Sequence, residues 1–247
     1  MLKIAICTPC YGDVTADYAS SLAKLVLRTG QTQVSFNGEL VFPQIEVFMR
    51  SSSVLPQLRN MLVKDAIEWN AHFLLWLDAD QKFPEDALLR LLSLGRSVVG
   101  ANYPRRVPPH RPTAVGLDGR LVCTTEEKAK AQEIVQVASL GFGCCLMDMT
   151  ILDRLHHHAL GNGQESFWPL FAVEMVGDGT EIIGEDAFFF RQLRAADVDV
   201  YLDHPLSWSI GHVHQRVLTN ADTRQDRPQE QRTSLKVTFE PHHKRLQ

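Results

Sequence analysis

The sequence lacks any unbroken run of the about 18 to 20 apolar residues that a membrane-spanning helix requires. Residues 1–7 also lack the basic segment, the long apolar core and the cleavage site of a secretory signal peptide. We therefore expect a cytoplasmic protein without a transmembrane segment. Internal repeats and extended low-complexity tracts are absent too, which excludes repeat architectures.

Cysteine is scarce, because five residues in a chain of 247 do not form a disulfide framework. Cys7 and Cys10 have the spacing of a thioredoxin-type redox pair, but that chemistry needs a helix to begin at the pair. Loop-forming residues follow here instead. We interpret the two thiols as small side chains packed at the end of a strand.

Charge of one sign is also lacking, since the formal net charge is only -4. This value gives no attraction of the whole protein to nucleic acid or anionic membranes, although a local basic strip is compatible with it. Two common nucleotide-binding motifs are missing as well. No Gly-x-x-x-x-Gly-Lys-Ser/Thr loop occurs, and no Gly-x-Gly-x-x-Gly follows the first predicted strand.

Strand-like and helix-like segments alternate along the chain, which favours an α/β fold with a mostly parallel central sheet flanked by helices. The expected strands are residues 3–8, 44–48, 73–77, 97–101, 113–117, 121–123, 134–138, 199–202 and 207–212, with one more after Gly143. The expected helices are residues 15–28, 54–69, 84–94, 151–158 and 186–196, with Ser53 and Thr150 as caps of the second and fourth. Residues 161–184 read as an irregular segment. We expect one domain over residues 1–214 and a polar, mildly basic extension over residues 215–247.

The most informative stretch is the apolar strand at residues 73–77, which stops at Asp78 and Asp80. In open α/β sheets, ligands bind beyond the carboxyl ends of the strands. Two neighbouring carboxylates repel each other, so a divalent metal, an Arg or a Lys is expected to hold them. The alternative is a pair of solvated acids that opens a loop.

Several short motifs surround this pair in a defined order. They are Thr8-Pro9-Cys10-Tyr11, Arg59-Asn60, Leu77-Asp78-Ala79-Asp80, Tyr103-Pro104-Arg105-Arg106, Gly141-Phe142-Gly143, Gly184-Glu185-Asp186 and Gly211-His212. Their order resembles that of the nucleotide-sugar glycosyltransferases with the GT-A fold, of the family-2 type, over about residues 3–214. The resemblance implies a Rossmann-like fold and transfer of a sugar from a nucleoside diphosphate, with UDP as the first candidate, to a hydroxyl group.

In the resembling family a Mn²⁺ or Mg²⁺ ion neutralises the departing diphosphate as a Lewis acid. The resemblance implies that Asp80 binds this ion directly, and that Asp78 faces the ribose or the waters of the metal. His212 matches the late histidine of the family, a further metal or diphosphate contact. His214 competes for this role, and a strand-end histidine bonded to the backbone is the alternative for both.

The resemblance also implies a set of contacts with the donor. Its residues are Arg59 and Asn60 for the base and diphosphate, Thr8, Pro9 and Tyr11 for the base, and Gly141 and Gly143 for close approach of the donor sugar to the backbone. Arg105 belongs to a basic strip with Arg106, His110 and Arg111, which is suited to a diphosphate or an anionic acceptor. Solvated or packed side chains are the alternative for each position.

Asp186 is the candidate general base, because a carboxylate at a helix N-terminus is favoured as the anion and can accept a proton. Glu185 beside it is suited to binding acceptor hydroxyls. Single displacement with inversion follows from this assignment, although retaining transferases carry a similar carboxylate and the stereochemistry stays open. An ordinary helix cap is the alternative.

The acceptor implied is a glycan or a hydroxymethylated DNA base, and the sequence does not indicate the oligomeric state. A second enzyme class shares part of the pattern, because Asp78, Asp80 and Asp178 resemble the acidic motifs of haloacid-dehalogenase phosphatases. Lys82 departs from that pattern. A non-catalytic nucleotide-sugar-binding module is a further alternative, but the metal carboxylates and the helix-start acid that such a module tends to lose are both present.

Overall fold

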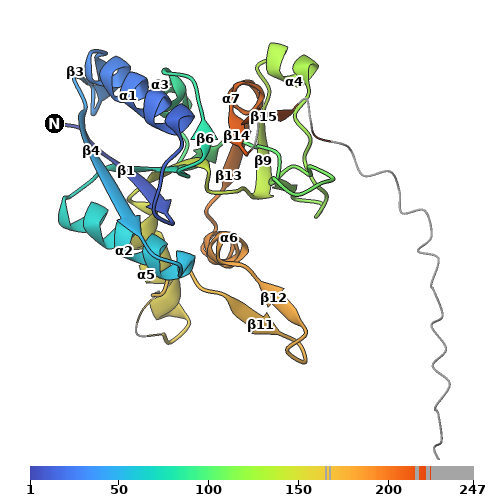
Figure 1. The fold of residues 1–247 in the computed structure, drawn as a ribbon. Helices are drawn as coiled ribbons and strands as arrows, with labels where there is room; N and C mark the ends of the chain where they lie inside the picture. Colours follow the sequence, from blue (N-terminus) through green and yellow to red (C-terminus); the bar gives the residue numbers. More distant parts are fainter. Residues whose placement is uncertain (165, 167, 215–216, 221–222, 224–247) are drawn as a thin grey trace, which may run out of the picture.

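The computed structural model describes residues 1–164, 166, 168–214, 217–220 and 223. A sheet of eight strands forms its centre (Figure 1). In spatial order the strands are β4 (Gln44–Ser51), β1 (Lys3–Cys10), β5 (Phe73–Leu77), β10 (Cys144–Asp148), β7 (Val98–Gly100), β13 (Val200–Asp203), β9 (Ile134–Ser139) and β8 (Val115–Gly116). Only β10 and β9 run against the common direction. The sheet is therefore mixed and mostly parallel, as predicted.

Helices cover both faces of this sheet (Figure 1). One face carries α1 (Ala16–Gly30), α3 (Ala87–Ser93) and α7 (His204–Ser209), and the other carries α2 (Leu55–Glu68), α5 (Ile151–Gly161) and α6 (Glu185–Ala195). The alternation of side chains along β5 shows why both faces are apolar. Leu75 and Leu77 pack under the first set of helices, whereas Leu74 and Trp76 pack under the second. The short helix α4 (Glu126–Lys130) lies against α7.

Three small sheets lie outside the core. They are the hairpin of β2 (Val34–Phe36) and β3 (Glu39–Val41), the hairpin of β11 (Glu174–Val176) and β12 (Glu181–Ile183), and the set β6 (Gln81–Lys82), β14 (Gly211–Val213) and β15 (Val217–Leu218). In the last set His212 lies opposite Gln81, and the Val213 N–H donates to the Asp80 carbonyl at 2.7 Å. This pairing brings the late histidine to the end of β5.

Several sequence predictions are confirmed in place and type. The strand over residues 73–77 is β5, and the helix after Thr15 is α1, whose Tyr18 N–H donates to the Thr15 hydroxyl at 3.1 Å. All five cysteines have free thiols, and Cys7 is buried within β1, where burial raises the thiol pKa. Neither Cys7 nor Cys10 lies at a helix start, so the packing interpretation agrees with their positions.

The expected strand at residues 207–212 is wrong over its first part, because α7 occupies residues 204–209, and only residues 211–212 belong to a strand, β14. The Asp203 carboxylate caps this helix by accepting from the Leu206 N–H at 3.0 Å, and Pro205 lies in its first turn. The irregular reading of residues 161–184 is also wrong in part, since this segment contains the β11–β12 hairpin. At the lower edge of Figure 1 the hairpin extends away from α6.

Of the two predicted helix caps, Thr150 occupies the N-cap position of α5 but makes no side-chain capping bond, whereas Val54 rather than Ser53 occupies that of α2. The Ser52 hydroxyl, not that of Ser53, accepts a hydrogen bond before α2, from the Val54 N–H at 3.1 Å. Before α5 the Asp148 carboxylate accepts from the Thr150 N–H at 2.9 Å. The helix predicted over residues 84–94 begins later, at Ala87, and residues 121–123 form only an isolated bridge to Val115.

The helices of the described residues are each too short or too polar to cross a bilayer. Most of the expected extension at residues 215–247 lies outside the described residues. Within its described part, the Asn220 side-chain amide is buried and donates to the Asn102 carbonyl at 2.9 Å. The chain therefore still packs against the sheet domain at this point.

Candidate active site

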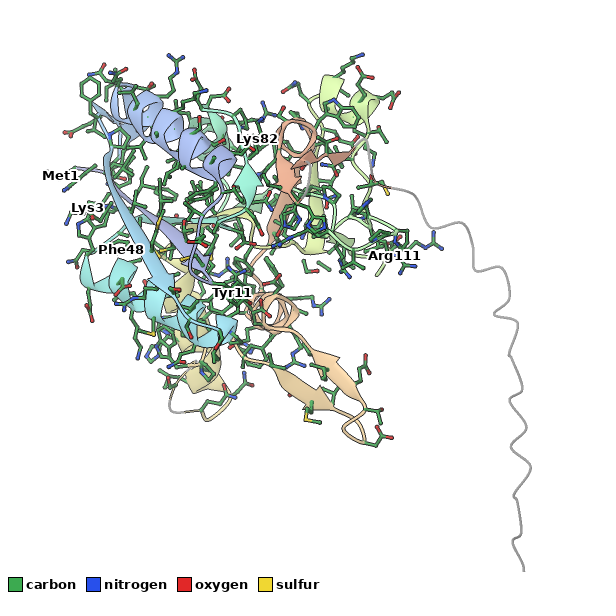
Figure 2. The ribbon with its side chains drawn as sticks, viewed as in Figure 1. Met1, Lys3, Tyr11, Phe48, Lys82 and Arg111 are labelled. Carbon is green, nitrogen blue, oxygen red and sulfur yellow. The ribbon has the colours of Figure 1, made fainter. Side chains whose placement is uncertain are left out.

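A pocket of about 460 Å³ lies where β1 and β5 end, at the edge predicted to bind ligands. It is lined by Pro9, Cys10, Tyr11, Asp13, Val14, Thr15, Leu55, Asp78, Ala79, Asp80 and Arg106. Tyr11 has 74% of its surface exposed and is labelled beyond the end of β1 in Figure 2. A pocket lined by an exposed aromatic ring and by carboxylates is suited to a nucleotide.

His212 and Asp80 face each other beside this pocket. The His212 Nε2 atom lies 3.3 Å from Asp80 Oδ1, and its Nδ1 atom lies 2.9 Å from the Pro104 carbonyl oxygen. A carbonyl accepts only, so Nδ1 carries the proton and Nε2 has a free lone pair, which accepts from the Arg106 Nε–H at 2.9 Å. Burial and the nearby Arg106 lower the His212 pKa, which keeps the ring neutral. His214 is exposed, so the structure places His212 rather than His214 at the carboxylate.

Arg106 bridges this pair. Its Nη2 atom contacts Asp80 Oδ2, and its Nε atom donates to His212 Nε2 at 2.9 Å. Almost half of the Arg106 side chain is exposed, whereas 18% of the Asp80 side chain is. The guanidinium therefore neutralises Asp80 from the solvent side, as a positive ion at this position also would.

Arg59 is the largest departure from the expected site. Its side chain is only 2% exposed and lies over the rings of Trp76, Phe142 and Phe171, with centroid distances of 5.3, 4.9 and 5.9 Å. A cation in such surroundings is stabilised by ring faces and by carboxylates. Arg59 therefore lies beneath the site and does not line the pocket.

The Arg59 guanidinium draws together carboxylates from two distant segments. Its Nη2 atom lies 3.4 Å from Asp78 Oδ1 and 3.8 Å from Asp186 Oδ1, and its Nε atom lies 3.8 Å from Glu185 Oε1. Asp78 follows β5, whereas Glu185 and Asp186 begin α6. Arg59 thus brings the candidate base Asp186 close to Asp78. The resemblance had assigned Arg59 to the nucleotide instead.

Asp186 differs from its expected electrostatic state. Burial, followed by the charges of Glu185 and Asp78, raises its pKa to about 7, although Arg59 opposes the shift. The helix terminus therefore does not keep this carboxyl as acidic as we expected, because loss of hydration outweighs it. Its Oδ1 atom is buried without a hydrogen-bond partner, while 38% of the side chain is exposed. A carboxyl group that titrates near neutral pH is well suited to accept a proton from a hydroxyl group.

Asn60 serves the scaffold in this structure. Its Oδ1 atom accepts from the N–H groups of Leu170 and Phe171 at 3.0 and 3.2 Å, and its Nδ2 atom donates to the carbonyls of Pro56 and Phe171. The amide is fully used by these bonds. Asn60 thereby fixes the segment that places Phe171 over Arg59. Thr8 is likewise buried, and its hydroxyl is bonded to that of Tyr18.

Gly141 and Gly143 accommodate Tyr103, a residue for which we predicted no role. A Cβ atom on Gly143 would lie 2.5 Å from Gln81 Nε2 and 2.6 Å from Tyr103 Cζ, and one on Gly141 would collide with the Tyr103 hydroxyl. The Tyr103 hydroxyl accepts from the Gly143 N–H at 2.7 Å, and its ring meets His212 edge to face at 5.4 Å. These glycines therefore place the ring that supports His212. No glycine role toward a sugar is visible in these contacts.

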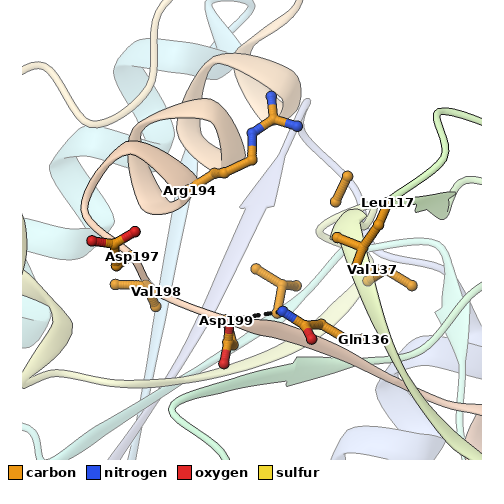
Figure 3. Close-up of a pocket in the computed structure, with 9 residues that line it drawn as sticks. Leu117, Gln136, Val137, Arg194, Asp197, Val198 and Asp199 are labelled. Atoms are coloured by element: carbon orange, nitrogen blue, oxygen red, sulfur yellow. Dashed lines mark hydrogen bonds between the residues drawn. The ribbon is translucent and has the colours of Figure 1, made fainter.

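Further pockets lie away from the carboxylates, including the following two. One of about 150 Å³ is lined by Leu117, Gln136, Val137, Ala138, Arg194, Asp197, Val198, Asp199 and Val200 (Figure 3). Its Gln136 amide donates to Asp199 at 2.7 Å, and none of the predicted site residues lines it. The other lies beside Arg105 and Arg111; Arg111 is labelled at the right of Figure 2.

The donor set at Asp80 partly fits a divalent ion. A carboxylate oxygen and a neutral imidazole nitrogen, 3.3 Å apart, are suitable neighbouring ligands for Mn²⁺ or Mg²⁺. Asp78 does not complete the set, because its carboxylate is paired with Arg59. Within the described part of the chain, no three His, Cys, Asp or Glu side chains lie close enough together to hold a metal. Asp80 and His212 therefore fit as a two-ligand site that needs oxygen atoms from a substrate or from water.

The second acidic motif of the phosphatase alternative lies elsewhere. Asp178 is in the turn of the exposed β11–β12 hairpin, and its carboxylate accepts from the N–H and hydroxyl of Thr180 at 3.1 and 2.5 Å. These bonds and the hairpin position account for the residue locally. Asp178 is not among the described acids that lie near Arg59, which are Asp78, Glu185 and Asp186.

The fold and the site together define a mixed α/β protein with a carboxylate-rich pocket at the carboxyl edge of its sheet. No protein-family model and no curated protein sequence matches the chain. Among solved structures, A197 from STIV is similar with a TM-score of 0.54 and 13% identity, over 95% of this chain and 100% of that one. S. aureus TarS 1-349 has a TM-score of 0.35 and 12% identity, over 82% of this chain and 57% of that one. At these identities the similarity to A197 concerns the fold alone, and a TM-score of 0.35 supports no inference.

Proposed function

We propose that the protein is a glycosyltransferase that moves a sugar from a nucleoside diphosphate sugar, with UDP as the first nucleotide to test, to an acceptor hydroxyl. The observation that carries this proposal is the meeting of Asp80, His212 and the Arg59-linked acids at one edge of the sheet. Glycosyl transfer needs positive charge at a diphosphate and a base at the acceptor. The two groups of residues supply suitable sites for both.

Asp80 and His212 are the residues that would hold Mn²⁺ or Mg²⁺, and the ion would supply Lewis-acid neutralisation of the diphosphate. Pro9 and Tyr11 line the pocket on the side suited to the base, and Asp78 faces it from the end of β5. Arg106 is displaced from Asp80 in this proposal and is then available to an anionic oxygen of the donor. Arg59 holds Asp78 and Asp186 in place from beneath.

Asp186 takes the proton of the acceptor hydroxyl as that oxygen forms a bond to the anomeric carbon. The bond from the anomeric carbon to the diphosphate oxygen breaks in the same step, and the electron pair leaves with the nucleoside diphosphate. A single displacement of this kind inverts the configuration. With a pKa of about 7, Asp186 is deprotonated in a large fraction of molecules near neutral pH and still basic enough to accept the proton.

A thermal shift experiment tests donor binding without knowledge of the acceptor. Mn²⁺ with UDP, each well above its dissociation constant, is expected to raise the melting temperature by about 5 °C or more, because both bind the folded state. Asp80→Asn is expected to lose most of this shift. Asp153→Asn, a change of an exposed acid on α5, is the matched control and is expected to keep it. No metal-dependent shift with UDP, GDP or dTDP would overturn the proposal.

A further inference from the structure

A large pocket lies outside the candidate active site. It has a volume of about 910 Å³ and is formed by the loops that follow β7 and β8 together with the start of α4. Its lining residues are Arg105, Arg111, Pro112, Asp118, Gly119, Arg120, Leu121, Val122, Cys123, Thr125 and Lys128. This volume is in the range of pockets that bind small molecules, about 300 to 1,000 Å³.

The lining is strongly basic in an acidic protein. Arg105, Arg120 and Lys128 line it together with one described acid, Asp118, so these four side chains carry a formal charge of three minus one, or +2. The chain as a whole carries -4. Arg120 is 88% exposed, and its only described acidic contact is a 3.8 Å approach to Asp118. A concave surface of one sign concentrates ligands of the opposite sign.

A buried amide holds the walls of this pocket together. The Asn102 side chain is inaccessible, and its Oδ1 atom accepts from the N–H groups of Thr113 and Ala114 at 2.9 and 3.1 Å. Its Nδ2 atom donates to the Val122 carbonyl at 2.6 Å. The Arg105 N–H in turn donates to the Arg111 carbonyl at 2.8 Å, which closes the loop between them. The basic side chains are thus presented by an anchored backbone.

The basic pocket and the candidate active site share a wall. Arg105 lines the basic pocket, whereas its neighbour Arg106 lines the pocket beside Asp80. The extended segment through Pro104, which forms a bridge with Pro112, separates the two. A molecule seated in the basic pocket therefore lies one peptide segment away from the donor site.

We propose that the basic pocket binds the phosphate group of a phosphorylated sugar, as part of the acceptor of the transfer reaction. Arg side chains bind phosphate oxygens in pairs of charge-assisted hydrogen bonds, and the apolar edges of Leu121 and Val122 are available to the face of a sugar ring. The role as acceptor rests on the proposed glycosyltransferase function. The binding of a sugar phosphate does not.

Duplex DNA fits these observations less well than a sugar phosphate. Protein–DNA interfaces bury about 1,000 to 2,500 Å² of protein surface and need an extended basic face. The basic side chains of the proposed site line a concave pocket in a chain with a net charge of -4. Such a chain gains little non-specific attraction to the DNA backbone.

Isothermal titration of the full chain at low ionic strength tests this proposal with glucose 6-phosphate as the probe and glucose as its uncharged partner. Glucose 6-phosphate is expected to bind and glucose is not. The double variant Arg120→Gln, Lys128→Gln is expected to weaken binding about tenfold or more, since two charge-assisted contacts are lost. The charge-retaining double variant Arg120→Lys, Lys128→Arg is expected to recover most of the affinity. Arg28→Gln, which removes an exposed charge on α1, is the control and should change nothing.

The same double variant separates this proposal from the proposed function. Its affinity for Mn²⁺ with UDP is expected to equal that of the unaltered protein, because neither residue lines the Asp80 pocket. No measurable binding of glucose 6-phosphate, or equal binding by the unaltered protein and the double variant, would overturn the phosphate site and leave the donor site standing. Tighter binding of duplex DNA that is lost in the double variant would also overturn it. If neither the unaltered protein nor the double variant binds UDP with Mn²⁺, only the role of the sugar phosphate as acceptor is overturned.

Discussion

His212 Nε2 lies 3.3 Å from Asp80 Oδ1 because two very short strands pair beyond the main sheet. β6 begins directly after Asp80, and β14 contains His212. The hydrogen bond from Nδ1 to the Pro104 carbonyl then fixes which ring nitrogen faces the carboxylate. Asp80, which follows β5, and His212, which lies shortly after α7, are therefore parts of one site.

Asp80 and Asp78 are expected to differ in their effect on metal affinity. Asp80→Asn should weaken Mn²⁺ binding in the presence of UDP by about 10- to 100-fold, because a charged ligand is lost. Asp78→Asn should weaken it much less, since that carboxylate is paired with Arg59. Titration of Mn²⁺ by electron paramagnetic resonance measures both variants. Equal losses in the two variants would contradict the division of roles, and His212→Gln is expected to resemble Asp80→Asn.

Replacement of the buried cation Arg59 is expected to destabilise the fold. Arg59→Met leaves three carboxylates without their common partner, and loss of one side of a buried charged cluster costs about 3 to 5 kcal/mol. Urea denaturation of the variant and of Arg28→Gln measures the difference, and the exposed control should stay within about 0.5 kcal/mol of the original protein. A loss below about 1 kcal/mol for Arg59→Met would mean that the cluster contributes little to the fold.

The pH dependence of transfer is expected to report Asp186. A general base acts when deprotonated, so kcat/KM should rise with pH and level off above about pH 7, the pKa that burial gives this carboxyl. Asp186→Asn should lower turnover by about 10²- to 10⁴-fold and leave UDP binding intact. A profile that is flat from pH 5 to pH 8 would remove Asp186 from the proton-transfer role.

The same group has a predicted effect on stability. Because its folded-state pKa is raised above the ordinary 3.8, the native state holds the proton more tightly than the unfolded state. The contribution of Asp186 to stability is therefore most favourable below about pH 4 and is lost as the pH rises to about 7. Between about pH 4 and pH 7, the urea midpoint of Asp186→Asn should fall less than the urea midpoint of the original protein. Parallel curves for the two proteins would contradict the raised pKa.

Gly143→Ala is expected to disturb the site through Tyr103. The added methyl group would lie 2.5 Å from Gln81 Nε2 and 2.6 Å from Tyr103 Cζ, and forced displacements of this kind cost about 1 to 3 kcal/mol. Gly161→Ala is the matched control, because its methyl group meets nothing within 4 Å and should be neutral or slightly stabilising. Thermal denaturation of both variants gives the comparison. An unchanged melting temperature for Gly143→Ala would show that Tyr103 has room to move.

Local sequence patterns were sufficient for the sheet and for most helices. The continuous apolar run of β5 and the Thr15 cap of α1 each specify their element within a few residues. The β11–β12 hairpin was missed although its signal is present, since Gly177 and Gly179 adopt positive φ angles around Asp178 in a hairpin turn. α7 was missed because the capping role of Asp203 competes with an alternating pattern that also suits a strand.

The arrangement within the site depended on contacts that no local pattern contains. A helical Arg is usually solvated, and only the convergence of three aromatic rings with acids from β5 and α6 explains why Arg59 is buried. Gly143 is similar, because its need for a small side chain comes from Tyr103 on a distant segment. The resemblance named Asp80, His212, Asp78 and Asp186, which the structure gathers at one edge of the sheet. Which of the site residues face the pocket and which support it from beneath was not predictable.

The most direct test of the glycosyltransferase proposal is the release of nucleoside diphosphate from a panel of nucleotide sugars, measured with Mn²⁺ and without it. Slow metal-dependent hydrolysis of one UDP-linked sugar is expected in the absence of an acceptor, with water taking the place of the acceptor hydroxyl. Asp80→Asn and Asp186→Asn should each abolish it, and Asp153→Asn should retain it. Absence of metal-dependent release from every UDP, GDP and dTDP sugar in the panel would contradict the proposal.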